Sequence, residues 1–516
     1  MNNMDWTVIA AFVLYFVGML SIGFFFMRGQ KNEKEYFIGG RKMGPWVTAM
    51  SAQASDMSGW LLMGFPGSIL AFGLGKVWIG IGLAIGTALN WIFVAKRLRN
   101  FSAAANDSIT LPQYLRNRFA TESKALQIIC AIVFLVFFTI YVASSFSAGA
   151  TVFASIIPQL QGHENIALLL FALIIIIYTF SGGFKAVCWT DFFQGILMLV
   201  AMLAVPLMML VSKDMGVGSV EPIAVLSKEP LETGAYSLNP FNASWKDIIS
   251  GLAWGLGYFG MPHILVRFMS IRKAKEVKKS ATVAIIWVIL TLGAAIVIAV
   301  LAAKTSTGNG LVNEFINLLK TGGQGTPQER VFIEIVIKIF PGFIAGILLS
   351  AIIAAAMSTA DSQLLVASSS FTSDIYKPVF RKNASDKETL WVGRAVVAIV
   401  AVVAYFIASS KGEFASSIMG MVENAWGGFG AAFGPVIILS LFWKRFTYKG
   451  AIAGVVGGAV VDVLWLIFLS DSTGIYELAP GFAAGLICAV VVTLIDKKPS
   501  EKVVAIYEAG VKGEEN

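Results

Sequence analysis

Two apolar segments of this chain are interrupted where a helix that crosses a membrane should be continuous. Residues 51–60 carry several serines, Asp56 and Gly59 inside an apolar stretch, and residues 251–263 combine several glycines with Pro262. A helix broken inside a bilayer leaves backbone N–H and C=O groups without partners, which is tolerated only where the backbone is buried in protein or lines a cavity. Two such breaks in corresponding spans indicate the binding site of a secondary transporter.

The composition supports a membrane protein. Apolar residues make up 57% of the chain, charged residues 14%, and the mean hydropathy is +0.76, whereas a soluble domain has about 25% charged residues. Three cysteines and two histidines predict neither a disulfide framework nor a CxxC or histidine-based metal centre. The first apolar segment has no basic region before it and no cleavage site after it, so we expect a retained helix and not a signal peptide.

The apolar segments predict an all-α polytopic membrane protein. A helix needs about 20 apolar residues to cross the hydrocarbon core. By this measure we expect about thirteen transmembrane helices, at 5–27, 43–64, 74–95, 125–156, 164–182, 188–211, 247–268, 280–304, 342–370, 391–409, 414–442, 450–470 and 478–495. Residues 1–496 are then a single transmembrane transporter domain, followed by a short charged cytoplasmic tail at 497–516.

The basic residues predict the orientation of the chain. Lysine and arginine concentrate in every second connection, at 28–42, 96–124, Lys185, 267–279, 377–387, 444–449 and the tail. Cytoplasmic loops carry this excess, so we expect the N-terminus outside and the C-terminus inside. Topology thus explains the net charge of +8 without a nucleic-acid partner. No glycine-rich phosphate loop is present, which argues against ATP. No catalytic set is visible, so we do not expect an enzyme, and the tail is too short for a signalling domain.

The spacing of the breaks predicts an internal repeat. They fall in the second and seventh predicted spans, five apart, and a repeat with an odd number of spans must invert between its copies. The copies would occupy approximately 43–211 and 247–442. This prediction depends on the breaks and the topology, because the two halves share no obvious residue identity.

Three carboxylates within the predicted spans are candidate functional residues. A charge at the bilayer centre costs at least about 2.5–3.5 kcal/mol, so such residues are usually functional. Asp56 is a cation partner, a proton site lining a pore, or a cap that accepts N–H bonds from Ser58 or Gly59. Asp191 either belongs to a site or is a solvated helix N-terminus. Asp361 lies in a polar cluster of the ninth span.

That polar cluster has its hydroxyl groups on one helix face. Ala355, Ser358, Thr359 and Ser362 stand at positions i, i+3, i+4 and i+7. Hydroxyl and carbonyl oxygens suit a small alkali cation, and an unwound segment at 54–57 would add free carbonyls. Alternatively, the hydroxyl groups bond to their own helix or pack against a neighbour.

The second break has a face of aromatic residues. Trp254, Tyr258 and Pro262 stand at i, i+4 and i+8 and would form a wall against which an aliphatic or ring-bearing solute packs. We expect the surrounding glycines to open a gap there. Tyr141 from a neighbouring span is a further candidate, and we interpret His263 as structural. The alternative is that the aromatic residues are ordinary core.

Several motifs resemble the sodium/solute symporter family, and in particular its proline-transporting branch. They are residues 51–64, 254–265, and 355–359 followed by Gln363. The resemblance extends to residues 39–42, 138–141, 180–184, 189–191 and 426–435 and covers nearly the whole chain.

The resemblance implies a LeuT-type fold with a five-plus-five inverted repeat in a bacterial cytoplasmic membrane. It implies a sodium site at Ala54, Met57, Ala355, Ser358 and Thr359, with Asp56 governing sodium affinity. It implies an L-proline pocket to which Ser58, Gly59, Tyr141, Trp254, Tyr258 and Pro262 contribute. Sodium would be co-transported, and no organic cofactor is expected.

One residue departs from the resemblance. Asp361 stands where symporters of the better-known Gram-negative type have an uncharged small residue. Relatives that use two sodium ions have hydroxyl groups here, facing an aspartate that matches Asp191. Asp191, Asp361 and Ser362, together with Ser358, are therefore a candidate second cation site. The alternative is that Asp361 pairs with a lysine or faces cytoplasmic water.

The sequence thus predicts a secondary active transporter that imports L-proline by sodium symport and alternating access. Its partners would be L-proline, sodium and the lipid bilayer, with neither nucleic acid nor ATP. A sodium symporter of another small amino acid or carboxylate solute is the alternative. A cation channel is less favoured, because a selectivity filter usually repeats identical elements around a pore and the two breaks differ.

Overall fold

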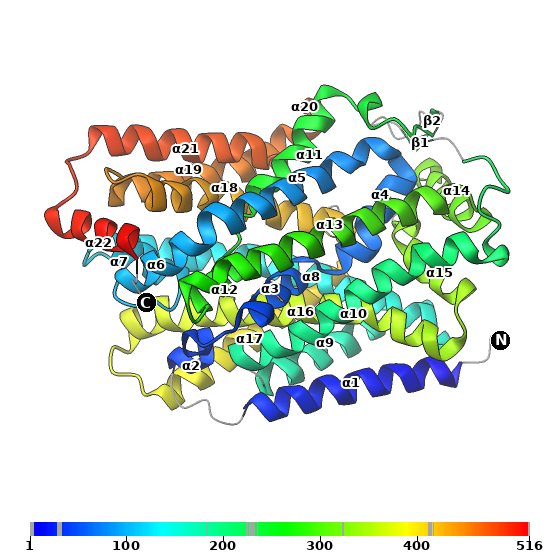
Figure 1. The fold of residues 1–516 in the computed structure, drawn as a ribbon, viewed down its shortest axis with the longest axis horizontal. Helices are drawn as coiled ribbons and strands as arrows, with labels where there is room; N and C mark the ends of the chain where they lie inside the picture. Colours follow the sequence, from blue (N-terminus) through cyan, green and yellow to red (C-terminus); the bar gives the residue numbers. More distant parts are fainter. Residues whose placement is uncertain are drawn as a thin grey trace.

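The computed structural model describes residues 5–27, 33–181, 183–222, 225–226, 233–234, 236–321, 325–410, 415 and 417–513. The regular secondary structure of this part of the chain is helical apart from a short antiparallel ribbon of β1 (Val225–Leu226) and β2 (Thr233–Gly234). Most of the long helices run roughly along the long axis of the molecule in Figure 1, and the two chain ends lie toward opposite ends of it.

The helices follow one another closely along the chain. They are α1 (Trp6–Met27), α2 (Glu33–Ile38), α3 (Pro45–Asp56), α4 (Phe65–Phe72), α5 (Val77–Leu89), α6 (Lys96–Ala104), α7 (Leu111–Arg118), α8 (Ala125–Ile156), α9 (Glu164–Ser181), α10 (Phe184–Val211) and α11 (Trp245–Gly257). They continue as α12 (Pro262–Ser270), α13 (Val277–Ala302), α14 (Ser306–Thr321), α15 (Val331–Ile339), α16 (Gly342–Ser370), α17 (Asp386–Ser409), α18 (Ile418–Phe442), α19 (Tyr448–Phe468), α20 (Ser470–Thr473), α21 (Leu478–Ile495) and α22 (Glu501–Lys512).

Eleven helices within the described residues are long and apolar enough to cross a membrane. Of two shorter apolar helices, Trp60–Phe72 overlaps the end of the second predicted span and continues beyond it, and Glu164–Phe180 lies within the fifth. The second predicted span, 43–64, is divided between α3 and the first of these short helices. The all-α membrane fold is therefore confirmed, and the count of about thirteen spans stays a prediction.

Both predicted helix breaks are present. α3 ends at Asp56, where Met57 leaves helical geometry (φ −83°, ψ 78°), and the helix resumes as the π-helical turn η2 (Trp60–Gly64) and then α4. The second break separates α11 from α12, which begins at Pro262. Proline is favoured at the first position of a helix, because the N–H that it lacks would have no partner within the helix there. In the interior of a helix the same residue removes a backbone hydrogen bond and breaks the helix.

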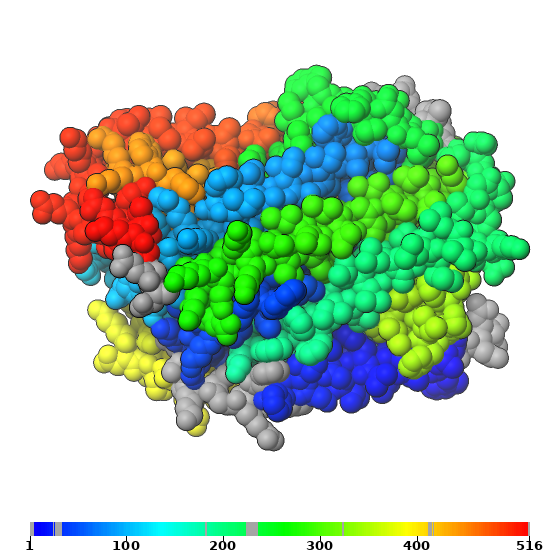
Figure 2. Space-filling model, in the orientation of Figure 1, coloured from blue at the N-terminus to red at the C-terminus, as the bar shows by residue number. Residues whose placement is uncertain are grey.

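The broken helices lie among the most deeply buried elements. α3 contacts α10, α13 and α16, while α11 contacts α5 and α18. Among the candidate spans, α16 and α18 are the most buried, with 83% of the apolar window inside the protein. On the face shown in Figure 2, α13 crosses between α5 and α10 and covers this interior. The breaks are thus surrounded by protein. This is one of the two settings in which a bilayer tolerates backbone N–H and C=O groups without helical partners.

The glycines near the second break do not open a gap, and that expectation is wrong. A Cβ atom at Gly255 would lie 2.3 Å from the carbonyl oxygen of Gly82, and one at Gly86 would lie 2.3 Å from that of Gly255. A Cβ at Gly257 would lie 1.9 Å from Trp426 Nε1. Small residues at membrane helix contacts let the backbones approach closely. These glycines therefore bring α11 against α5 and α18.

We expect Gly86→Ala to lower the thermal unfolding midpoint of the purified protein in detergent. Overpacking a tight contact typically costs about 1–3 kcal/mol. Gly293→Ala in α13 is the matched control, because a Cβ there meets nothing within 4 Å. That substitution should be neutral or stabilising, since alanine favours a helix by up to about 1 kcal/mol over glycine. Equal midpoints for the two variants would contradict the close α5–α11 contact.

The charged tail contains a folded helix. α22 packs on α6, where Gly510 lies against the ring of Phe101 and Arg97 Nη2 donates to Tyr507 Oη at 3.3 Å. Arg118 Nη1 also donates to the carbonyl oxygen of Val503 at 3.3 Å. The sequence predicted the charge of this tail but not its helix; residues 514–516 lie outside the described part.

Candidate functional site

The two helix breaks meet through a hydrogen bond between their side chains. Tyr258 Oη donates to Asp56 Oδ2 at 2.6 Å, and both residues are buried. Tyr141 of α8 donates to the backbone oxygen of Asp56 at 3.2 Å. Three candidate residues from distant parts of the sequence thus lie together at the centre of the protein.

The interpretation of Asp56 as a helix cap is wrong. Its bonded carboxylate oxygen accepts from Tyr258, and the N–H of Ser58 bonds to the backbone oxygen of Asp56 at 3.0 Å. The other carboxylate oxygen, Oδ1, is buried without a partner among the described residues. A buried carboxylate with one free oxygen is available to a cation.

The predicted cation site brings α3 and α16 into direct contact. Ser358 Oγ lies 2.7 Å from the carbonyl oxygen of Ala54 and 3.1 Å from that of Ala355. The neighbouring Thr359 is fully buried, and its hydroxyl has no partner in the described part of the chain. Met57 lies at the end of α3. These oxygens are the hard ligands that alkali and alkaline-earth cations prefer.

Aromatic rings surround the second break. Tyr258 meets Trp426 edge-on at 5.0 Å between ring centroids, and Trp254 stacks on Tyr476 at 5.3 Å. Trp426 Nε1 donates to the backbone oxygen of Trp254 at 2.8 Å. The Trp60 ring lies 6.4 Å from that of Trp254. The helical spacing predicted that Trp254 and Tyr258 line one face. The rings of Trp60, Trp426 and Tyr476 come from other segments of the chain, and the spacing gave no sign that they would pack there.

Ser58, Gly59 and Pro262 flank these aromatic residues. A Cβ atom at Gly59 would lie 2.4 Å from the Cβ of Ala148 in α8, so only glycine fits there. Ser58 is fully buried directly after α3. Pro262 is buried at the first position of α12.

A second polar cluster surrounds Asp191. Asp191 Oδ2 accepts from Arg267 Nη2 at 2.8 Å and from Ser51 Oγ at 2.6 Å. Arg267 Nη2 also donates to Ser362 Oγ at 2.6 Å. Asp361 is fully buried, with Oδ1 3.4 Å from Ser362 Oγ. The predicted second-site residues are therefore adjacent.

Two interpretations of these carboxylates are corrected. Asp191 is fully buried and paired, so it is not a solvated helix end. Asp361 is also fully buried, so it does not face water, and the cation near it is Arg267. The sequence placed Arg267 at the end of the seventh predicted span, 247–268, and counted it with the basic connection 267–279 that follows. It lies instead within α12 and is 1% exposed.

A third polar cluster was not predicted. Asp462 of α19 is fully buried, and both its carboxylate oxygens have no partner among the described residues. A Cβ atom at Gly427 would lie 3.0 Å from Asp462 Oδ1 and 3.4 Å from Glu477 Oε1, so these carboxyl groups are close. Glu477 lies in a connection that the sequence gave no functional role.

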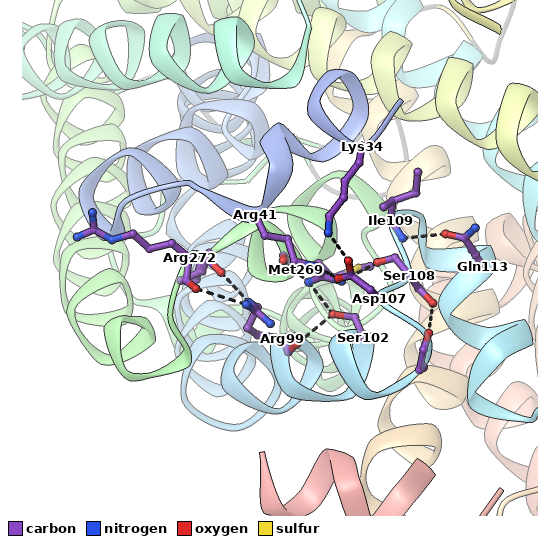
Figure 3. A network of polar contacts seen from close by, with 12 residues as sticks. Lys34, Arg41, Arg99, Ser102, Asp107, Ser108, Ile109, Gln113, Met269 and Arg272 are labelled. Atoms are coloured by element: carbon purple, nitrogen blue, oxygen red, sulfur yellow. Dashed lines mark hydrogen bonds and ion pairs between the residues drawn. The ribbon is translucent and has the colours of Figure 1, made fainter. Parts of the chain in front are cut away.

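Figure 3 shows a polar network at the end of the protein where α3 begins and α12 ends. Arg41 Nε donates to Asp107 Oδ1, and its Nη2 donates to the carbonyl oxygen of Ser108, both at 2.7 Å. Lys34 also contacts Asp107. Burial raises the pKa of Asp107, but Lys34 and Arg41 outweigh this and hold that pKa below its usual range.

The backbones beside this network join the two broken helices. The N–H of Met43 donates to the carbonyl oxygen of Ser270 at 3.3 Å, and the N–H of Arg272 donates to that of Met43 at 3.1 Å. Arg99 Nε donates to the carbonyl oxygen of Ile271 at 2.6 Å. The chain entering α3 and the chain leaving α12 are thus held together in this structure.

Known proteins resemble the chain over nearly its whole length. A sodium/proline symporter of Escherichia coli (strain K12) is 44% identical over 493 residues, 96% of this chain and 94% of that protein. A high-affinity proline transporter of Bacillus subtilis (strain 168) is 42% identical over 487 residues, 94% of this chain and 97% of that protein. An osmoregulated proline transporter of the same organism is 39% identical over 496 residues, covering 96% of each.

Solved structures share the fold. A Na⁺-coupled sialic acid symporter, solved in a substrate-bound outward-open state, superposes with a TM-score of 0.71 at 19% identity over 97% of this chain and all of that chain. Mhp1, a transporter of the nucleobase-cation-symport-1 family, gives a TM-score of 0.56 at 14% identity over 92% of this chain and 97% of that chain. At these identities the likeness establishes the fold alone.

The family follows from these findings. The model of the sodium:solute symporter family matches residues 36–458, which is most of the chain. The motifs at the two breaks and on α16 fall within this region, and the relatives named above extend beyond it at both ends. The chain belongs to the sodium:solute symporter family.

Proposed function

We propose that this protein imports L-proline together with sodium by alternating access, and that it is not an enzyme. The observation that carries the proposal is the hydrogen bond that joins the two helix breaks, Tyr258 Oη to Asp56 Oδ2 at 2.6 Å, beside the Ser358–Ala54 contact. The relatives named as proline transporters are 39–44% identical over most of the chain. Their substrate supports proline as the solute here.

Sodium is proposed to bind between α3 and α16. Its ligands would be the backbone oxygens of Ala54, Met57 and Ala355 with the hydroxyls of Ser358 and Thr359. The Ser358 hydroxyl now donates to Ala54, and it would turn its lone pairs to an ion placed there. Sodium would then order the end of α3, next to Asp56.

Proline is proposed to lie between the two breaks. Its carboxylate would accept from N–H groups near Ser58 and Gly59, at the N-terminus of the half-helix that continues into α4. Its pyrrolidine ring would pack against Trp254 and Tyr258, near Tyr141 and Pro262. These rings are fully or almost fully buried in this structure, so the solute enters only when the surrounding helices move.

The membrane topology is part of the proposal. We place about thirteen helices in a bacterial cytoplasmic membrane, with the N-terminus outside and the C-terminus inside. Residues 1–496 form one transporter domain, with inverted repeats near 43–211 and 247–442. The network around Arg41 then lies on the cytoplasmic side, and its contacts to Ser108 and Asp107 would break when the protein opens inward.

Coupling between the two solutes tests this proposal. Coupling is reciprocal, so proline should tighten sodium binding by the same factor by which sodium tightens proline binding, typically about 5–150-fold. Titrating purified protein with sodium, with and without saturating proline, measures the factor. L-alanine, which has no ring to pack on Trp254, is the control and should shift sodium affinity less. An unchanged sodium affinity with proline would contradict the coupling, and an equal shift with alanine would contradict proline as the solute.

A further inference from the structure

The backbone carbonyl of Tyr258 lacks the donor that an uninterrupted helix would give it. Tyr258 directly follows α11 and keeps helical backbone angles (φ −55°, ψ −33°). A helical carbonyl accepts from the N–H four residues later. Here that residue is Pro262, which has no N–H. Because an unpaired buried carbonyl is costly, this one needs a donor from another part of the chain.

The side chain of Asn90 supplies that donor. Its Nδ2 donates to the carbonyl oxygen of Tyr258 at 2.9 Å, and Asn90 is fully buried. Its other amide atom, Oδ1, has no partner among the described residues. An amide turned the other way would place two acceptor oxygens against each other. The Tyr258 carbonyl therefore orients the Asn90 amide, and the amide in turn holds that carbonyl.

The helix that carries Asn90 is itself irregular at this point. Asn90 begins the π-helical turn η4 (Asn90–Ala95), which lies between α5 and α6. Such turns are rare and frequently lie at functional sites. The next residue, Trp91, meets the ring of Phe268 in α12 edge-on, with 4.5 Å between ring centroids. This turn therefore contacts both sides of the second break, at Tyr258 after α11 and at Phe268 in α12.

Tyr258 connects this contact to the first break. Its carbonyl accepts from Asn90, and its hydroxyl donates to Asp56 Oδ2 at 2.6 Å. The position of the hydroxyl depends on where the Tyr258 backbone stands. A displacement of that backbone by about 1 Å away from Asp56 would take the bond out of hydrogen-bonding range. The Asn90 amide is thus linked to the Asp56 carboxylate through a single residue.

We propose that Asn90 is a positioning residue of this transporter: by holding the Tyr258 carbonyl, it keeps the Tyr258 hydroxyl on Asp56 and so raises the affinity for sodium. The inference rests on the proposed sodium–proline symport, in which Asp56 acts on the sodium ion bound beside Ala54. Asn90 acts through Tyr258 and contacts neither solute. If Asn90 only paired a buried carbonyl, its loss would lower the amount of active protein and leave the sodium dependence unchanged.

The sodium dependence of Asn90→Ala tests the inference. Uptake of labelled proline into proteoliposomes is measured at saturating proline over a range of sodium concentrations and scaled to the amount of folded protein. We expect the half-maximal sodium concentration to rise about tenfold with little change in maximal rate, because the Tyr258 carbonyl loses its donor and the hydroxyl leaves Asp56. An unchanged half-maximal concentration would overturn the inference. Absence of sodium-driven uptake by the wild-type protein would instead contradict the proposed function.

The matched control is Ser368→Ala. Ser368 of α16 is 1% exposed, and its hydroxyl donates to the carbonyl oxygen of Gly393 in α17 at 2.9 Å. This variant also removes a buried bond from a side chain to the backbone of another helix, but it leaves both breaks intact. The inference predicts a wild-type half-maximal sodium concentration. If Ser368→Ala raised that concentration as much as Asn90→Ala, general destabilisation would explain the effect and the inference would be wrong.

A double-mutant cycle tests whether Asn90 acts through the Tyr258 hydroxyl. Tyr258→Phe removes that hydroxyl, so adding Asn90→Ala in this background should change the half-maximal sodium concentration by less than about two-fold. A further tenfold rise would show two independent effects and overturn the inference. Asn90→Leu removes the donor while filling similar space, and it replaces Asn90→Ala in every comparison if the alanine variant does not fold. A wild-type sodium dependence of Asn90→Leu would equally overturn the inference.

Discussion

Replacing Asp56 by asparagine is expected to raise the sodium concentration for half-maximal transport about 10- to 150-fold, since losing a charged partner in a buried site costs about 1.5–3 kcal/mol. Asp56 Oδ1 has no partner among the described residues, and the other carboxylate oxygen, Oδ2, accepts from the neutral Tyr258. This carboxylate is therefore available to attract the sodium ion that we propose to bind beside Ala54. The measurement is sodium-dependent proline uptake at saturating proline.

The control for this variant is the same change at another buried carboxylate. Asp462 is as buried as Asp56 but lies on α19, away from the Ser358–Ala54 contact. Asp462→Asn should leave the half-maximal sodium concentration within about two-fold, because it removes no oxygen from the α3–α16 contact and sites without shared partners couple weakly. If both variants raised it equally, or if neither did, the role given to Asp56 in sodium binding would be wrong.

Replacing Ser358 by alanine is the second change with a large expected effect. The Ser358 hydroxyl lies 2.7 Å from the Ala54 oxygen and 3.1 Å from the Ala355 oxygen, at the centre of the proposed ion site. Removing it takes away one ligand and one α3–α16 contact. We expect about a tenfold rise in the half-maximal sodium concentration, corresponding to about 1.4 kcal/mol. Sodium titration of proline uptake measures it.

Ser350→Ala is the matched control on the same helix. Ser350 is also fully buried in α16, but its hydroxyl donates to the carbonyl oxygen of Gly346 within the helix at 2.8 Å. Its loss should leave sodium dependence unchanged. Equal sodium dependence in Ser358→Ala and Ser350→Ala would contradict a sodium site on the Ser358 face.

The helix breaks and the polar face of α16 could be predicted because they follow from local chemistry. Glycine, proline and buried polar residues in an apolar segment mark a break wherever the segment folds. Ala355, Ser358 and Ser362 share a face in any helix, because they stand three and four residues apart. The side chains that complete the site could not be predicted in this way. Tyr258 bonds to Asp56 across 202 residues of sequence, and no local pattern encodes that contact.

Arg267 shows why the sequence misled at one position. It stands at the end of an apolar segment and before several lysines, which is typical of a cytoplasmic loop. Whether Arg267 lies in a loop or in the protein interior depends on two features. α12 continues to Ser270, and Asp191 lies opposite Arg267 and pairs with it. Likewise, we expected the glycines of α11 to leave a cavity, because they have no side chains. The backbone of Gly82 and the ring of Trp426 fill the space beside them instead. The burial of Arg267 and the close contacts of these glycines both depend on tertiary packing, which no local pattern in the sequence encodes.

The most direct test of the account is uptake of labelled proline into proteoliposomes under an inward sodium gradient, an inward lithium gradient, or a proton gradient alone. The account predicts transient accumulation above equilibrium that requires sodium, since the ion site between α3 and α16 must be filled before the proline pocket forms. Equilibration without accumulation, or accumulation that is the same without sodium, would contradict sodium–proline symport.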